Sequence, residues 1–157
     1  MQLPTHFFLT QGVAESDVSP LNCFDAALLD AGVTHCNLVP VSSILPKGCE
    51  EIQVVPSLPP GCILHCVLAR AEGIHDGVEG DQISAALAFG IGPEHGIVAE
   101  FSGKVHVTRA EHEVCAMLDE MARMRDMSLS RQEVLCATVP KVTKRHGCAV
   151  VVLGLCM

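Results

Sequence analysis

Two adjacent serines, Ser42 and Ser43, end a short apolar run and stand just before a turn signalled by Pro46 and Gly48. A serine hydroxyl becomes a nucleophile when a neighbouring base activates it. Its oxygen can also leave from the β carbon. The pattern alone is typical of turn residues. The pair therefore becomes a candidate for chemistry only if other parts of the sequence support it.

The other reactive side chains do not combine into a known motif. Cys62 and Cys66 flank His65, but no second Cys or His pair follows at the spacing of metal ligands. The surrounding run is also too apolar to favour a thiolate. We interpret the nine cysteines as small buried hydrophobes of a cytoplasmic protein and expect no metal. A metal or redox protein built on cysteine is kept as an alternative class.

Composition narrows the function classes further. The 157 residues predict one domain, and the 49% hydrophobic content excludes a disordered chain. A net charge of −8 argues against nucleic acid as a partner, because phosphate binding needs clustered positive charge. The longest apolar runs fall far short of the roughly 20 residues that span a bilayer. We therefore expect neither a nucleic-acid nor a membrane partner.

Periodicity and turn signals predict an α+β fold, with mostly antiparallel sheets covered by two helices. Strands are predicted over residues 6–10, 36–41, 62–71, 83–89, 96–101, 133–142 and 148–155. Loops are predicted at Gly12–Asp17 and over 72–81, and the prolines between 46 and 60 limit any strand there to a short or edge strand. Three alanines make helix a competing prediction for 83–89.

The two predicted helices have distinct start signals. The first begins at Pro20 behind the N-cap Ser19 and ends at Gly32. Its core-facing positions are Phe24, Ala27, Leu28 and Ala31. The second runs from about 109 to 125 behind a capping box of Thr108 and Glu111. Its apolar stripe, which predicts core packing, consists of Val114, Met117, Leu118, Met121 and Met124.

Several segments together resemble one enzyme family. They are PLNCFDAALLDAG, NLVPVSSILPKG, LPPGCI, ISAALAFGI and GIVAEFSG, in this order. Over residues 6 to 155 the chain resembles the pyruvoyl-dependent arginine decarboxylases. The resemblance implies a small α/β sandwich of the pyruvoyl-dependent decarboxylase type, with helices over the sheets, that assembles as a trimer. It also implies decarboxylation of L-arginine to agmatine and CO₂.

The resemblance gives the serine pair a role. It implies that the single domain 1–157 cuts itself between Ser42 and Ser43, leaving a beta chain 1–42 and an alpha chain 43–157. The Ser43 hydroxyl attacks the Ser42 carbonyl, and Ser43 ends as a covalent pyruvoyl group that serves as the cofactor. Asn37 matches the family residue that donates to the oxyanion of this step.

Two acids match further family positions. Glu100 matches the proton donor, and its apolar flanks Val98, Ala99 and Phe101 predict partial burial. Asp25 matches the residue that meets the substrate guanidinium, and leucines at helical spacing predict partial shielding. The net charge of −8 is compatible with a cationic substrate.

Two departures and two alternatives remain open. Pro40 removes a backbone donor near the cleavage segment, which puts the local strand pairing in question. Phe101 stands where the family often has Tyr. A carboxylate at 25 also suits ornithine or lysine, so another basic amino acid is an alternative substrate. An unprocessed, non-catalytic paralogue is an alternative of another class.

Overall fold

The computed structural model describes residues 3–157 and confirms the predicted α+β class. Two helices, α1 (Pro20–Asp30) and α2 (Val107–Arg123), accompany two sheets in this part of the chain. The strands are β1 (His6–Ser16), β2 (Asn37–Pro40), β3 (Ile44–Pro46), β4 (Glu50–Glu51), β5 (Ile63–Ile74), β6 (Ile83–Ile91), β7 (His95–Gly103), β8 (Arg131–Val139) and β9 (His146–Cys156).

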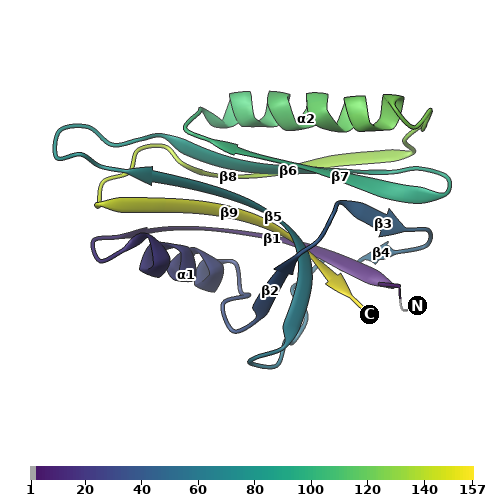
Figure 1. The fold of residues 1–157 in the computed structure, drawn as a ribbon, viewed down its shortest axis with the longest axis horizontal. Helices are drawn as coiled ribbons and strands as arrows, with labels where there is room; N and C mark the ends of the chain where they lie inside the picture. The colour runs from purple at the N-terminus through teal and green to yellow at the C-terminus, as the bar shows by residue number, and fades with distance from the viewer. Residues whose placement is uncertain (1–2) are drawn as a thin grey trace.

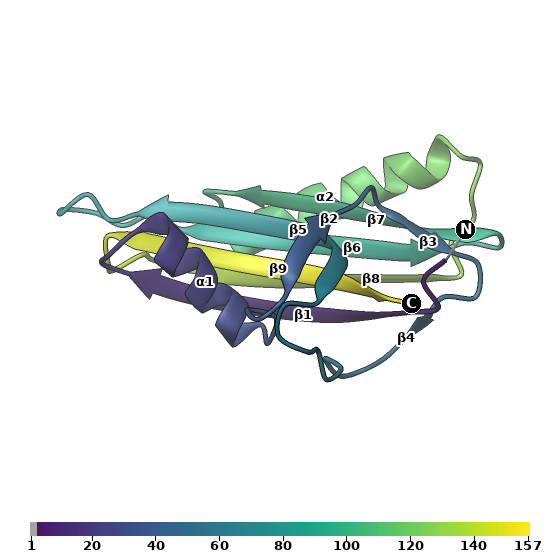
Figure 2. The same ribbon diagram turned by 60° about the horizontal axis from the view of Figure 1, so that its bottom comes forward.

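The two sheets stack face to face, and one helix covers the outer face of each (Figure 1). The five-stranded sheet has the order β2-β5-β9-β1-β4, and α1 packs on its outer face. The four-stranded sheet has the order β3-β7-β6-β8 and carries α2. Figure 2 shows β3 and β4 near the chain termini, away from α1. Both are short strands at sheet edges, as the prolines predicted.

Strand β6 forms the centre of the molecule, because it is covered on both faces. Every residue from Ile83 to Gly90 is buried. Leu87 and Phe89 point into the core between the sheets, whereas Ala86 and Ala88 face α2. Small side chains on the second face let the helix approach closely. The competing prediction of a helix here is wrong, because β6 pairs with β7 and β8 along its length.

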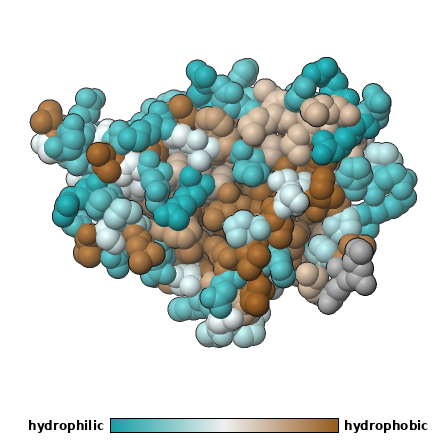
Figure 3. Space-filling view, viewed as in Figure 1, coloured by the Kyte–Doolittle hydropathy of each residue, from teal (hydrophilic) through white to brown (hydrophobic). Residues whose placement is uncertain are grey.

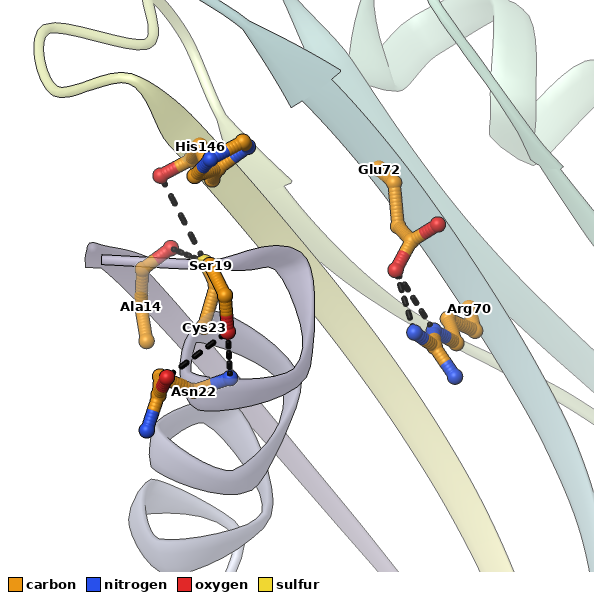
Figure 4. A network of polar contacts seen from close by, with 7 residues as sticks. All are labelled: Ala14, Ser19, Asn22, Cys23, Arg70, Glu72 and His146. Carbon is orange, nitrogen blue, oxygen red and sulfur yellow. Dashed lines mark hydrogen bonds and ion pairs between the residues drawn. The ribbon is translucent and has the colours of Figure 1, made fainter. Parts of the chain in front are cut away.

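Helix α1 has the predicted ends. The Ser19 hydroxyl accepts a hydrogen bond from the Asn22 N–H at 3.0 Å (Figure 4). Pro20 occupies the first turn. Gly32 adopts the left-handed φ of +78° that lets the chain turn away. Ala27 and Leu28 are buried as predicted, and Phe24 is half-buried.

The predicted loop at Gly12 is wrong, because β1 continues through it to Ser16. Gly12 is in the strand because α1 crosses directly over it. A Cβ at this position would lie 2.1 Å from the Ala27 carbonyl oxygen. The glycine signal here marks a close approach of two backbones rather than a turn.

Helix α2 departs from its prediction at both ends. The N-cap is His106, whose ring nitrogen accepts from the Thr108 N–H, so the predicted capping box does not form. Val114 and Leu118 are buried, but Met117 and Met124 are exposed. The buried stripe instead includes Ala110 and Ala122. The apolar face is therefore rotated relative to the predicted one.

The remaining differences concern strand lengths. Strand β5 extends to Ile74, three residues beyond the predicted end, because it continues its ladder with β9. Strand β8 covers 131–139 rather than 133–142, and β8 and β9 belong to different sheets. Among residues 3–157, no helix has the length and apolar character needed to cross a membrane.

Candidate active site

The Ser42–Ser43 bond lies where the chain passes from one sheet to the other. Strand β2 belongs to the five-stranded sheet and β3 to the four-stranded sheet, so the two serines span the gap between them. The Ser43 carbonyl accepts from the Val98 N–H at 2.9 Å, and the Ser42 carbonyl accepts from the Ile44 N–H at 3.0 Å. Both carbonyls flanking Ser43 are therefore held by backbone donors.

Strand β7 brings Glu100 to Ser43. The Ser43 hydroxyl donates to Glu100 Oε2 at 3.2 Å. Side chains alternate along a strand, so Glu100 lies on the same face as Val98, which packs into the core between the sheets. Strand β3 pairs with β7 over residues 95–97, and among residues 3–157 no strand pairs with this edge of β7 beyond the Val98–Ser43 hydrogen bond. Glu100 is consequently exposed, and the predicted partial burial is wrong for the single chain.

Asn37 lies elsewhere. It begins β2, is exposed, and donates from Nδ2 to the Gly61 carbonyl at 3.0 Å. The four residue steps from Asn37 to Val41 cover about 13 Å of extended strand. An asparagine side chain cannot bridge that separation. The donor at the Ser42 carbonyl within one chain is instead the Ile44 N–H.

Asp25 lies near Asn37 rather than near Ser43. The Thr34 hydroxyl donates to Asp25 Oδ1 at 2.7 Å, and Thr34 precedes Asn37 by three residues. The predicted shielding of Asp25 is wrong for the single chain, because Asp25 is exposed and Leu21 and Leu29 are 72% and 63% exposed.

Thr34 and Gly61 are contacts of the predicted site residues that sequence reasoning missed. Each makes its contact across a loop, Thr34 to Asp25 and Gly61 to Asn37. Neither stands in a motif or at a periodic spacing, so the sequence carries no signal for them. The four predicted site residues thus form two groups: Ser43 with Glu100, and Asp25 with Asn37.

The structure answers the question raised by Pro40. The N–H groups of Asn37 and Val41 donate to the carbonyls of Cys62 and Cys66. Alternate residues of a strand point their N–H groups to opposite sides, so a donor at position 40 would point away from β5. Strand β2 is the edge of its sheet. Pro40 therefore removes no ladder bond.

A shallow groove of about 340 Å³ adjoins the cleavage segment. Ser42 lines it together with mostly apolar side chains, among them Val41, Ile44 and Leu155. Ile44 and Val39 are also partly exposed. Figure 3 shows the apolar area in brown across the lower centre of the molecule, over β2 and β5 as they lie in Figure 1.

The cysteines lie in apolar surroundings. Cys23, Cys66 and Cys148 are buried, and the other six are half-buried, so the predicted burial holds fully for three. Burial raises the pKa of Cys66 to about 11, in keeping with the prediction that this run disfavours a thiolate. Within residues 3–157, no three His, Cys, Asp or Glu side chains are arranged to hold a metal ion.

The two-sheet sandwich, with a carboxylate hydrogen-bonded to the second of two serines, fits the pyruvoyl-dependent decarboxylase type that the sequence resembles. Comparison with protein families supports that class and narrows it. The chain belongs to the pyruvoyl-dependent arginine decarboxylase family, whose model matches residues 6–157. The family name implies a pyruvoyl prosthetic group.

Curated relatives in archaea carry the same description. The pyruvoyl-dependent arginine decarboxylase of Methanopyrus kandleri is 36% identical over 139 residues, covering 88% of this chain and 87% of the relative. That of Methanocaldococcus jannaschii is 34% identical over 151 residues, covering 94% and 87%. That of Thermococcus kodakarensis is 34% identical over 152 residues, covering 96% and 94%.

Proposed function

We propose that this chain decarboxylates L-arginine to agmatine and CO₂, with a pyruvoyl group made from its own Ser43. Its family and the descriptions of its relatives support the reaction. The observation that carries the assignment to this chain is the 3.2 Å hydrogen bond from Ser43 to Glu100. This hydrogen bond joins Ser43, which would become the prosthetic group, to Glu100, an acid that can transfer a proton.

The prosthetic group arises by self-cleavage. The Ser43 oxygen adds to the Ser42 carbonyl carbon, the C–N bond breaks, and an ester replaces the amide. Elimination then breaks the Cβ–O bond, releases chain 1–42 with a free carboxylate, and leaves dehydroalanine at 43. Hydrolysis yields ammonia and the pyruvoyl group. The Ile44 N–H, which donates to the Ser42 carbonyl at 3.0 Å, and the Asn37 amide of another copy of the chain would together stabilise the oxyanion.

The surroundings of Ser43 fit the group that replaces it. Its backbone carbonyl accepts from the Val98 N–H, a contact that survives cleavage because residue 43 keeps its bond to Ile44. When formed, the pyruvoyl carbonyl supplies the electron sink for loss of CO₂. Glu100 holds the proton that is delivered to carbon after CO₂ leaves. Asp25 accepts hydrogen bonds from the substrate guanidinium.

We infer that the complete site is built from more than one copy of the chain. The extended path of β2 separates Asn37 from Ser43 within one chain, and Asp25 contacts Thr34, three residues before Asn37, rather than Ser43. Asp25, Asn37 and Glu100 are exposed and Ser43 is half-buried. Large apolar side chains of the neighbouring segments are exposed as well, among them Leu21, Leu29, Ile44 and Ile63. We infer a homotrimer in which Asn37 and Asp25 of one copy face Ser43 and Glu100 of the next.

Two measurements test the reaction. An intact mass after prolonged incubation should give two masses, for chains 1–42 and 43–157, with the second blocked by pyruvoyl. Assays with arginine, ornithine and lysine should give agmatine as the main product. A single uncut mass would favour the non-catalytic alternative. Faster turnover of ornithine or lysine would move the assignment to another basic amino acid.

Complementation tests the shared site. Asn37→Ala keeps Ser43, and Ser43→Ala keeps Asn37. Neither variant should cleave alone, but co-expressed chains should assemble mixed trimers in which the Asn37→Ala chain is cut. Equal amounts of uncut Asn37→Ala chain, alone and mixed, would refute the exchange of residues between copies.

A further inference from the structure

The thiols of Cys36 and Cys62 are in direct contact. The Cys62 thiol donates to the Cys36 sulfur, with 3.4 Å between the two Sγ atoms. Both residues are half-buried, so a small oxidant can reach them. The pair lies where β2 and β5 begin side by side. It is outside the Ser43–Glu100 centre.

The backbone around the pair suits a disulfide. Gly61 N–H donates to the His35 carbonyl at 2.7 Å, and Asn37 N–H donates to the Cys62 carbonyl at 2.8 Å. Neighbouring strands lie about 4.8 Å apart, within the Cα separation that disulfides span. The sulfurs need to approach by only about 1.4 Å to reach bonding distance. Rotation of the two side chains supplies that movement without a shift of the strands.

The two cysteines lie on opposite sides of the cleavage bond. Cys36 belongs to chain 1–42 and Cys62 to chain 43–157. The shorter chain contains one other cysteine, Cys23. Cys23 is buried and donates to the carbonyls of Ala14 and His146 at 3.3 and 3.4 Å (Figure 4). Its thiol is thus engaged by backbone acceptors, whereas that of Cys36 faces another thiol.

We propose that Cys36 and Cys62 form a disulfide under oxidising conditions and thereby join the two chains produced by self-cleavage. The joining rests on the proposed cleavage, but the bond itself does not. The fitting oxidant is a small disulfide such as oxidised glutathione. The minor ionised fraction of one thiol attacks it and releases one glutathione, and the second cysteine then attacks the resulting mixed disulfide and releases the other. The two thiol protons go to the two glutathione molecules.

The bond would act on the part of the fold that carries Asn37. Within residues 3–157, β2 is an edge strand whose one partner is β5. After cleavage its end at Ser42 is free, and its hold on the larger chain is non-covalent. A disulfide one residue before Asn37 fixes the start of β2 to the start of β5. It also preserves the contact from Asn37 to the Gly61 carbonyl.

The test uses the purified, fully reduced protein treated with oxidised glutathione. Denaturing gels without reductant should show chains 1–42 and 43–157 migrating together, and added reductant should separate them. The intact mass should be two hydrogens below the sum of the chains. Cys36→Ser and Cys62→Ser should each abolish the link. The matched control Cys23→Ala should retain it.

Peptide mapping makes the result independent of cleavage and of any variant's folding. A peptide pair joined through Cys36 and Cys62 in the oxidised wild-type protein supports the proposal, whether the chain is cut or whole. An uncut chain carrying this pair would refute self-cleavage but not the disulfide. Chains that separate after oxidation, or a link that maps to Cys23 and Cys148, would overturn the proposal.

Discussion

The Ser43 hydroxyl and the Glu100 carboxylate meet across a 3.2 Å hydrogen bond, although 57 residues separate them in the sequence. The contact depends on β3, which follows Ser43 directly and pairs antiparallel with β7. This pairing holds Ser43 beside the edge of β7. One carboxylate thus stands beside the proposed nucleophile before cleavage. On the proposed mechanism, the same carboxylate would deliver the proton to carbon after cleavage.

Glu100→Gln should separate the two reactions of the site. The amide oxygen can still accept from Ser43, so cleavage should be largely retained. Decarboxylation should fall about 10²- to 10⁴-fold, because the amide has no proton to deliver. Intact mass measures the first reaction, and CO₂ release the second. Glu94→Gln is the matched control, because Glu94 is an exposed acid at the same hairpin and pairs with Lys47. Equal losses in both reactions would argue against a proton-donor role.

Replacing each serine separately tests the direction of cleavage. Ser43→Ala removes both the nucleophile and the leaving group, so the chain should stay whole and inactive. Ser42 contributes only its carbonyl, so Ser42→Ala should still be cut and active. Mass spectrometry after incubation distinguishes the two variants. Cleavage of Ser43→Ala, or loss of cleavage only in Ser42→Ala, would contradict the assignment.

The sequence predicted those features of the fold that depend on a few neighbouring residues, such as the two ends of α1. Ser19, Pro20 and Gly32 fixed α1 because capping and left-handed geometry depend on a few neighbouring residues. Gly12 misled the prediction, because its meaning depends on α1 crossing over β1. The sequence also could not predict that β8 and β9 belong to different sheets. Strand pairing over such separations leaves no periodic trace.

The site divides in a similar way. The family resemblance supplied its residue types and positions. It did not supply their grouping. The structure brings Ser43 to Glu100 and places Asp25 and Asn37 away from both. The predicted burial of Glu100 and Asp25 is wrong for the single chain, because apolar neighbours in the sequence do not have to cover an acid in the fold. Whether those residues cover the acids depends on what packs against the open edges.

Asp25→Asn tests recognition of the substrate side chain. A charge-assisted hydrogen bond contributes about 1.5–3 kcal/mol, so the KM for arginine should rise about 10- to 100-fold with a smaller change in kcat. Steady-state kinetics measures both. Asp30→Asn is the matched control on the same helix, because Asp30 accepts from the Val13 N–H and should not meet substrate. An unchanged KM in Asp25→Asn would remove Asp25 from the binding site.

Gly12→Ala tests the close approach that holds α1 on its sheet. The added methyl would meet the Ala27 carbonyl oxygen at 2.1 Å, and neither backbone can yield without moving the helix. We expect a loss of about 1–3 kcal/mol in the free energy of unfolding, measured by urea denaturation. Gly103→Ala is the control, because its Cβ would lie 3.6 Å from the Phe101 ring, an ordinary contact. Equal stability of the two variants would refute this account.

Stability should fall in alkaline solution because buried thiols must ionise on unfolding. Burial raises the pKa of Cys66 to about 11 and that of Cys148 to about 12, whereas unfolded thiols ionise near about 8.5. Above that pH the unfolded state binds fewer protons than the native state, so the free energy of unfolding declines as pH rises. Urea midpoints from pH 7.5 to 10.5 measure this slope. Cys66→Ala should be less stable throughout, yet should lose stability more slowly with pH. The same slope in variant and wild type would show that the Cys66 thiol ionises equally in both states.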